Sequence, residues 1–128
     1  MRNNSRINSI LFSSGARCLQ ETCWCPQADV YRGSHGWLVK FDLAGVRPED
    51  IEIVFDGSRL SVKGIRRDLF VEKGYNSCSM EISYSHFGRT ISLSDDVKTA
   101  CVTTEYRDGM LLVKVTNEFS VFSSHAEV

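Results

Sequence analysis

Apolar and polar residues alternate one by one through several short segments of this chain, and no other feature constrains its fold as strongly. The clearest segment runs from Trp37 to Leu43, where every second residue is large and apolar. A strand points successive side chains to opposite faces, so this alternation is typical of a strand with one buried face. No segment keeps the longer repeat of an amphipathic helix. The chain is therefore predicted to consist of strands.

Further segments with the same alternation complete a set of short predicted strands. They lie at residues 51–55, 60–62, 80–84, 91–93, 102–106 and 110–115. Asp56-Gly57 and Asp108-Gly109 supply turn residues, because Asp and Gly tolerate the positive φ that tight hairpins require. Many short strands separated by turns are typical of an antiparallel sandwich or barrel. The fold class is therefore predicted to be all-β.

A polar beginning and a polar end flank the alternating segments and divide the chain into three parts. Residues 1–25 are rich in Asn, Ser and Arg and are predicted to be a flexible N-terminal arm with one apolar patch at 10–12. Residues 26–117 are predicted to form the β-sandwich, and residues 118–128 a short C-terminal tail. The 128 residues fit one domain of ordinary size.

Composition argues against several classes of function. The formal net charge of −1 gives no attraction toward nucleic acid or an anionic membrane, so neither is an expected partner. No apolar run approaches the roughly 20 residues that a membrane-spanning helix needs. The patch at 10–12 is too short for the apolar core of a secretory signal, so a cytoplasmic location is expected. The odd count of 5 cysteines fits reduced thiols better than a disulfide framework.

Five short motifs follow one another through residues 24–117. They are Trp24–Tyr31 (WCPQADVY), Lys40–Ile51 (KFDLAGVRPEDI), Leu60–Gly64 (LSVKG), Glu81–Arg89 (EISYSHFGR) and Gly109–Leu111 (GML). In their order and spacing they resemble the α-crystallin domain of the small heat-shock proteins. Three positions depart from the family pattern, since Ala44 stands where Pro is usual and Ile82 and Ser85 replace Arg and Gly.

The resemblance implies an immunoglobulin-like antiparallel sandwich that is not an enzyme and needs no cofactor or metal. Residues 65–79 have the loop length of the bacterial and plant branch of the family, where a loop strand crosses to a partner subunit. Such an exchange satisfies edge hydrogen bonds that would otherwise template aggregation. The candidate interface residues of this homodimer are Leu69, Phe70, Val71, Glu81 and Arg89, the last two as an ion pair. Alternatively, the loop segment packs on its own core and the two charges are solvated surface groups.

The resemblance also implies an ATP-independent chaperone of the stress response, a holdase that binds unfolding polypeptides and prevents their aggregation. Burial of client apolar surface would supply about 25 cal/mol per Å². Two places are candidates, namely the arm and a groove that the family forms between the strands near 51–55 and 102–106. The candidate client-binding residues are Ile10, Leu11, Phe12, Ile51, Phe55, Val102 and Leu111. The plainer alternative is an ordinary core position for each or, in the arm, disorder.

The tail departs most from the family pattern. The family ends in a short Ile-x-Ile or Ile-x-Val motif that docks into a neighbouring subunit and builds large assemblies. The nearest equivalent here is Phe119-Ser120-Val121, very close to the end of the domain. Phe119 and Val121 are therefore weak candidates for a docking motif, and the expected assembly is a homodimer that associates further only loosely.

Two other functions stay open on the sequence. Cys18, Cys23 and Cys25 with His35 or His86 offer zinc or redox ligands, although the paired Cys-x₂-Cys knuckles of structural zinc sites do not occur. The other alternative is a CS-domain-like co-chaperone module that binds one specific protein partner, although that smaller sandwich lacks the long loop. Hydrolytic and nucleotide-dependent functions have no supporting motif, because neither a Gly-x-Ser-x-Gly elbow nor a phosphate-binding loop occurs.

Overall fold

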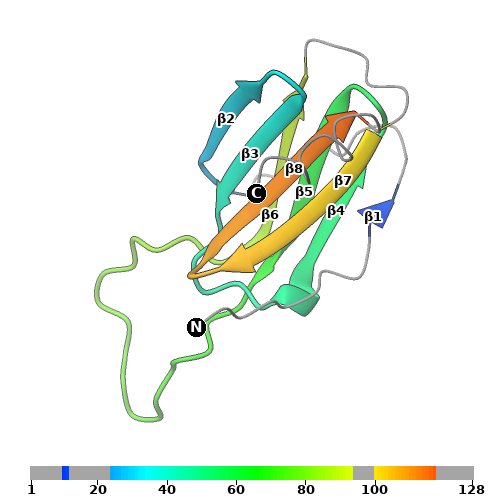
Figure 1. Cartoon of the computed structure of the whole chain (residues 1–128). Helices are drawn as coiled ribbons and strands as arrows, with labels where there is room; N and C mark the ends of the chain where they lie inside the picture. Colours follow the sequence, from blue (N-terminus) through cyan, green and yellow to red (C-terminus); the bar gives the residue numbers. More distant parts are fainter. Residues whose placement is uncertain (1–9, 12–23, 94–99, 118–128) are drawn as a thin grey trace.

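The computed structural model describes residues 10–11, 24–93 and 100–117 of the 128-residue chain. Within these residues, two four-stranded β-sheets face one another (Figure 1). A long loop extends away from one end of the sandwich, at the lower left of the view (Figure 1). The predicted all-β sandwich is thereby confirmed.

The two sheets are built from strands that are distant in the sequence. The first sheet has the order β1 (Ile10–Leu11), β4 (Ile51–Phe55), β5 (Arg59–Arg66) and β6 (Ser85–Ser92). The second has the order β2 (Ala28–Gly33), β3 (Gly36–Asp42), β8 (Met110–Asn117) and β7 (Ala100–Arg107). A 3₁₀ turn, η1 (Pro48–Asp50), leads into β4. The pairings between these strands are antiparallel except that of β1 with β4, which is parallel.

Strand alternation places one face of each sheet in a shared core. Val39 and Phe41 of β3 are fully buried, whereas Leu38 and Lys40 beside them are only partly covered. Both sheets contribute to this core, so it holds the two layers together. The buried apolar residues are Val39, Phe41, Leu43, Val46, Ile51, Ile53, Phe55, Leu60, Val62, Phe87, Leu93, Tyr106, Leu111, Val113 and Val115.

The two turns predicted from Asp-Gly pairs are confirmed. β7 and β8 are joined by Asp108 and Gly109, whose φ angles of 54° and 78° are the positive values that a two-residue hairpin turn requires. Between β4 and β5, the carboxylate of Asp56 accepts a hydrogen bond from the backbone N–H of Arg59 at 2.7 Å. This side-chain contact closes the turn at Gly57, whose φ is 98°.

Tyr106 of β7 holds the connection between β3 and η1 against the second sheet. Its hydroxyl oxygen lies 2.7 Å from the carbonyl oxygen of Leu43 and 2.6 Å from that of Val46. Burial raises the pKa of the Tyr106 hydroxyl above its ordinary value, so the group stays protonated and donates at neutral pH.

The strand predicted at residues 80–84 is wrong. Met80 and Ile82 are each 65% exposed and lie in irregular chain before β6. β5 ends at Arg66, which pairs with Ser85, so residues 80–84 extend beyond the last residue of the neighbouring strand. Alternating residues do not form a strand where no neighbouring strand offers backbone hydrogen bonds.

Candidate protein-interaction surfaces

The loop between β5 and β6, residues 67–84, gathers exposed apolar side chains. Of the exposed large apolar residues in the described chain, all except Val30 and Tyr31 lie in this loop. Phe70 is 90% exposed, Val71 68% and Leu69 47%. The segment 69–71 therefore does not pack on the core of its own chain, and apolar groups exposed together in this way are typical of a binding surface.

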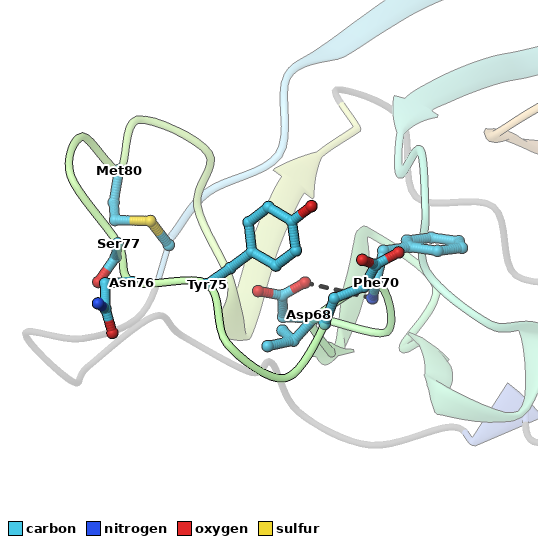
Figure 2. Close-up of a pocket in the computed structure, with 8 residues that line it drawn as sticks. Asp68, Phe70, Tyr75, Asn76, Ser77 and Met80 are labelled. Carbon is cyan, nitrogen blue, oxygen red and sulfur yellow. Dashed lines mark hydrogen bonds between the residues drawn. The ribbon is translucent and has the colours of Figure 1, made fainter.

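The loop also folds around a hollow of its own. The lining residues are Asp68, Phe70, Val71, Glu72, Tyr75, Asn76, Ser77 and Met80. In Figure 2 the Tyr75 ring and the Met80 side chain point into the space that the loop encloses, and the Phe70 ring lies at its other end. The carboxylate of Asp68 accepts a hydrogen bond from the backbone N–H of Phe70 at 3.4 Å. Apolar side chains beside polar groups suit the binding of a polypeptide segment.

Arg66, the last residue of β5, ties the two ends of this loop together. Its Nε donates to the carbonyl oxygen of Ser83 at 2.7 Å, and its Nη2 donates to the same oxygen. Its Nη1 donates to the carbonyl oxygen of Ala44 at 3.1 Å. The guanidinium carbon lies 4.1 Å from the centroid of the Trp24 ring and 5.7 Å from that of Tyr84. Arginine can make this whole set of contacts because its planar group donates as a fork and stacks on aromatic faces.

An Arg66→Lys substitution is expected to loosen the loop where it joins β6 without unfolding the sandwich. Lysine keeps the charge but loses the planar fork, and hydrogen bonds to charged groups contribute about 1.5–3 kcal/mol. We therefore expect the backbone amides of residues 83–86 to exchange hydrogen about tenfold faster or more. Arg59→Lys, at the opposite end of the same strand, is the control and should leave these amides unchanged. Equal exchange in both variants would contradict a holding role for Arg66.

Asp50 of η1 holds the first residue of the loop, Arg67, in place. Its carboxylate accepts hydrogen bonds from Arg67 Nε at 3.1 Å, from Arg67 Nη2 at 3.3 Å and from Arg47 Nε at 3.2 Å. Chiefly through the hydrogen bond from Arg67, the pKa of the Asp50 carboxyl lies below its ordinary value. The contact links η1 to the residue that directly follows β5.

The Asp50 contacts are expected to make stability depend on pH. Because the pKa of Asp50 is lower in the folded chain, the stabilisation is complete above the unfolded value of about 3.9 and is lost as the pH falls through the folded value. We expect Asp50→Asn to be less stable than the wild type at neutral pH, and the difference to shrink below about pH 4. Salt should also reduce the difference, since both arginine side chains are nearly half exposed. Urea unfolding of the wild type and of Asp50→Asn at several pH values measures the difference in stability. A difference independent of pH would contradict a stabilising role of the ionised Asp50 carboxylate.

β2 is an edge strand with an uncovered face. Among the described strands it pairs with β3 alone. Val30 is in register with the buried Val39 and so lies on the core side of the sheet, yet it is 42% exposed. On the other face, Tyr31 is 47% exposed, with Lys40 Nζ 4.9 Å from its ring centroid. β2 therefore presents an open edge and an uncovered apolar residue to any further strand.

β4 and β7 lie on the same side of the sandwich, where the sequence predicted a client-binding groove (Figure 1). Ile51, Phe55 and Leu111 are 3%, 1% and 0% exposed and belong to the core, because strand alternation turns them toward the opposing sheet. Val102 is partly buried against the same core. Three of these side chains therefore line the core rather than an open surface, and client binding by all four stays a prediction. β7 has β8 as its one described partner, whereas β1 runs along the outer edge of β4.

The two charged candidates for the dimer interface belong to different parts of the chain, one to β6 and one to the loop before it. Arg89 of β6 is partly buried, and its Nη1 donates to the carbonyl oxygen of Pro26 at 3.0 Å. Glu81 is exposed in the loop before β6. An ion pair between Glu81 and Arg89 of two subunits stays a prediction.

Several predicted residues lie outside the described part of the chain. They are Phe12, Cys18, Cys23, Phe119 and Val121. Of the other residues weighed for a zinc or redox site, Cys25, His35 and His86 are exposed. Within residues 10–11, 24–93 and 100–117, His, Cys, Asp and Glu residues form no group of three that could hold a metal ion.

Sequence reasoning missed the role of Arg66 and the strand β1. Arg66 belongs to the charged run Arg66-Arg67-Asp68, which is typical of a solvated loop. Its one available signal is its place at the end of a predicted strand, where a long side chain can reach neighbouring loops. β1 has two residues, Ile10 and Leu11, which is too few for any alternation to be recognised.

Residues 29–125 of the chain match the sequence model of the Hsp20/alpha crystallin family. The chain belongs to this family. Small heat shock protein C4 of Rickettsia felis is 28% identical over 90 residues, which cover 70% of this chain and 55% of that protein. Heat shock protein 16.0 of Schizosaccharomyces pombe superposes with a TM-score of 0.63 at 23% identity, covering 74% of this chain and 88% of that one. The hspA of Xanthomonas axonopodis superposes with a TM-score of 0.62 at 24% identity, and the match covers 74% of this chain and 95% of that one.

These likenesses confirm the small heat-shock resemblance and the α-crystallin sandwich. Membership in the Hsp20 family supports a chaperone role in general, and small heat shock proteins are non-enzymatic chaperones. The chain spans 55% and 58% of the lengths of the two Rickettsia felis relatives that it matches. In the described part of this Hsp20-family chain, no helix has the length and apolar character needed to cross a membrane.

Proposed function

We propose that this Hsp20-family chain is an ATP-independent holdase, a homodimer formed by exchange of the loop 67–84 that binds unfolding polypeptides. The proposal rests on two features that could complete each other, an exposed apolar loop segment and a sheet edge without an outer strand. The loop segment 69–71 exposes apolar side chains, with Phe70 90% exposed. The edge strand β2 has no outer partner among the described strands. The loop segment could supply the missing outer strand, and β2 could bury the exposed side chains of the segment.

Exchange between two subunits would complete both features at once. An extended segment 69–71 of one subunit, laid along β2 of the other, would pair with its open backbone groups. The added side chains would also cover Val30, which is 42% exposed on the core side. Half of the loop, fully extended, reaches about 30 Å, which is enough to contact a neighbouring domain. Two-fold symmetry would repeat the contact, so each dimer would contain it twice.

Client binding would rest on apolar groups outside the exchanged segment, together with the arm residues 10–12. Tyr75, Met80 and Ile82 are 76%, 65% and 65% exposed. Burying client apolar area against such groups contributes about 25 cal/mol per Å². The flexible Met80 side chain favours adaptation to clients of different shape. Binding and release would follow mass action without nucleotide.

The proposal includes a cytoplasmic location. Among the described residues, Cys78 and Cys101 are free thiols, which suits a reducing compartment. Fractionation of cells that express the full chain should recover it with cytoplasmic markers, and recovery with membranes would contradict this location.

The holdase activity is tested by light scattering from heated clients. With the protein at near-equimolar ratio, we expect the aggregation of several unrelated clients to be suppressed. Addition of ATP should leave the suppression unchanged. If aggregation of every unrelated client proceeds as without the protein, the generic holdase is wrong, and a module with one specific partner becomes the better account.

The exchange is tested by the mass of a loop variant in solution. The triple variant Leu69→Ser, Phe70→Ser and Val71→Ser should sediment as a monomer at concentrations where the wild type is a dimer. The matched control replaces three polar residues of the same loop by Ser, namely Glu72, Lys73 and Asn76, and should remain dimeric. A dimeric apolar-to-Ser variant would contradict exchange through residues 69–71.

A further inference from the structure

Ser85, the first residue of β6, has a backbone conformation that serine rarely adopts. Its φ is 77°, in the left-handed region where an L side chain crowds the neighbouring carbonyl group. Asp108 is the other described non-glycine residue with a positive φ, and a tight hairpin turn requires it there. Ser85 instead pairs with Arg66, at the point where the loop 67–84 returns to the sheet. The conformation costs about five- to thirtyfold in an equilibrium constant, so other contacts must hold it.

Two side chains from other segments hold the backbone on both sides of Ser85. The indole Nε1 of Trp24 donates to the carbonyl oxygen of Ser85 at 3.3 Å, and the backbone N–H of Trp24 donates to that of His86 at 3.1 Å. On the loop side, Arg66 Nε donates to the carbonyl oxygen of Ser83 at 2.7 Å. A strained residue persists where its surroundings fix the chain before and after it, as they do here.

Trp24 and Arg66 also contact each other, and together they are called the latch below. The guanidinium carbon of Arg66 lies 4.1 Å from the centroid of the Trp24 ring. The same ring lies 5.2 Å, centroid to centroid, from the ring of Phe87, which is buried in the core. The latch is thus anchored on the sandwich and reaches out to the end of the loop. Its contacts can open locally while the core stays folded.

The conformation of Ser85 sets the direction in which the loop leaves the domain. A change of φ at one residue between a strand and a loop re-aims the whole loop, as hinge residues do. With the positive φ of Ser85, the loop extends away from one end of the sandwich (Figure 1). Its segment 69–71 is exposed in this arrangement, within reach of a second subunit. Relaxation of Ser85 to an ordinary negative φ would turn the loop in another direction.

We infer that Ser85 is a strained hinge, closed by the Trp24–Arg66 latch, that positions the loop for exchange between subunits. With the latch closed, the loop is presented to a partner. With the latch open, Ser85 relaxes and the loop turns away, so that exchange stops. The inference rests on the proposed exchange and adds its control. A glycine at position 85 would carry no such strain, so the control comes from the serine that stands here.

The control has a measurable size. The apparent dissociation constant equals the intrinsic one divided by the fraction of competent molecules, and a symmetric dimer needs two closed hinges. If about half of the free chains have a closed hinge, the dimer is about fourfold weaker than one formed from chains that are always closed. Removing the strain should recover up to that factor, and removing the latch should weaken the dimer further.

The first test measures the strain through the stability of Ser85→Gly. The control is Ser92→Gly at the opposite end of β6, where the serine is exposed and is not among the described residues with a positive φ. Glycine relieves strain at position 85, whereas at position 92 it only increases the entropy of the unfolded chain. We expect the unfolding equilibrium constant of Ser85→Gly to be about tenfold lower than that of Ser92→Gly. Urea unfolding of the full chain at low protein concentration measures both.

The second test follows the hinge itself by NMR spectroscopy. A residue with positive φ gives a strong intraresidue NOE between its Hα and its amide proton, because the two protons lie close together. We expect this signal from Ser85 in the wild type and a weaker one in Trp24→Phe, which keeps an aromatic ring but lacks the Nε1–H donor. The control is Trp37→Phe in β3 of the other sheet, which should leave the Ser85 signal unchanged.

The third test measures the dimer by sedimentation at several concentrations. Ser85→Gly should tighten the dimer by up to about fourfold, and Trp24→Phe should weaken it. The double variant, Trp24→Phe with Ser85→Gly, should regain most of the lost affinity, because glycine adopts the positive φ without a latch. The controls Ser92→Gly and Trp37→Phe should dimerise as the wild type does.

Three outcomes would overturn the inference. Ser85→Gly and Ser92→Gly could unfold alike, the Ser85 NOE could be the same in Trp24→Phe as in the wild type, or the double variant could dimerise as weakly as Trp24→Phe. A wild type that stays monomeric at every concentration would remove the proposed exchange together with its control. A dimeric wild type whose affinity changes in neither Ser85→Gly nor Trp24→Phe would keep the exchange and remove the control alone.

Discussion

A Gly64→Ala substitution is expected to destabilise the domain by about 3 kcal/mol or more, the upper range for overpacking a core. A β-carbon on Gly64 would lie 1.9 Å from the backbone carbonyl oxygen of Asp50 and 2.8 Å from Cζ of Phe87. The carbonyl oxygen is part of the backbone, and the Phe87 ring, 2% exposed, is confined by the core. β5 and η1 would therefore have to separate, which disturbs the first sheet beside the base of the loop.

Gly33→Ala is the matched control for Gly64→Ala. The nearest atom to its new β-carbon would be the carbonyl oxygen of Gly36 at 3.8 Å, an ordinary contact. We expect a change within about 0.5 kcal/mol. Urea unfolding followed by circular dichroism measures both variants, at one protein concentration because dimerisation changes the apparent stability. Equal unfolding midpoints would contradict the close approach of β5 to η1.

A Phe41→Ala substitution is expected to cost about 3–5 kcal/mol, the usual loss for truncating a buried aromatic side chain. Phe41 is fully buried, on the face of β3 that packs against the first sheet. The substitution removes its transfer free energy and leaves a cavity that the surrounding strands cannot fully close. A loss of this size is a large part of the total stability of a small domain.

The same substitution at Phe70 provides the control for Phe41→Ala. Phe70 is 90% exposed in the loop, so the change should stay within about 0.5 kcal/mol at concentrations where the chain is monomeric. Denaturant titrations at two protein concentrations separate this effect from any effect on dimerisation. Equal losses for Phe41→Ala and Phe70→Ala in the monomer would contradict the described core.

Most of the sandwich could be predicted because alternation and turn chemistry act locally. Val39 and Phe41 are buried where alternation predicts, since a strand can bury one face only if its apolar residues recur at every second position. Asp108 and Gly109 form the predicted turn because few other residues adopt the positive φ that it requires. Such features depend on a few neighbouring residues, so a single sequence contains them.

The candidate site was harder to predict because it depends on packing between distant segments. Ile51, Phe55 and Leu111 would be apolar in either a groove or a core, and the position of the opposing sheet decides between them. The alternation at 80–84 resembles a strand, but the neighbouring strand ends before it. Arg66 acquires its role through contacts with groups far from it in the sequence, such as the Trp24 ring. None of these relations is visible in a local pattern.

The position of the loop has a consequence for how the scaffold can change. β5 and β6 pair directly, with Arg66 opposite Ser85, so residues 67–84 are an insert in an otherwise simple hairpin. The entropy of closing a flexible chain grows with the logarithm of its length, so lengthening a short turn about fourfold costs only about 1.2 kcal/mol. Inserts of very different length are therefore compatible with the same pair of strands. Recognition segments of new specificity can be grafted at this position while the domain itself continues to fold.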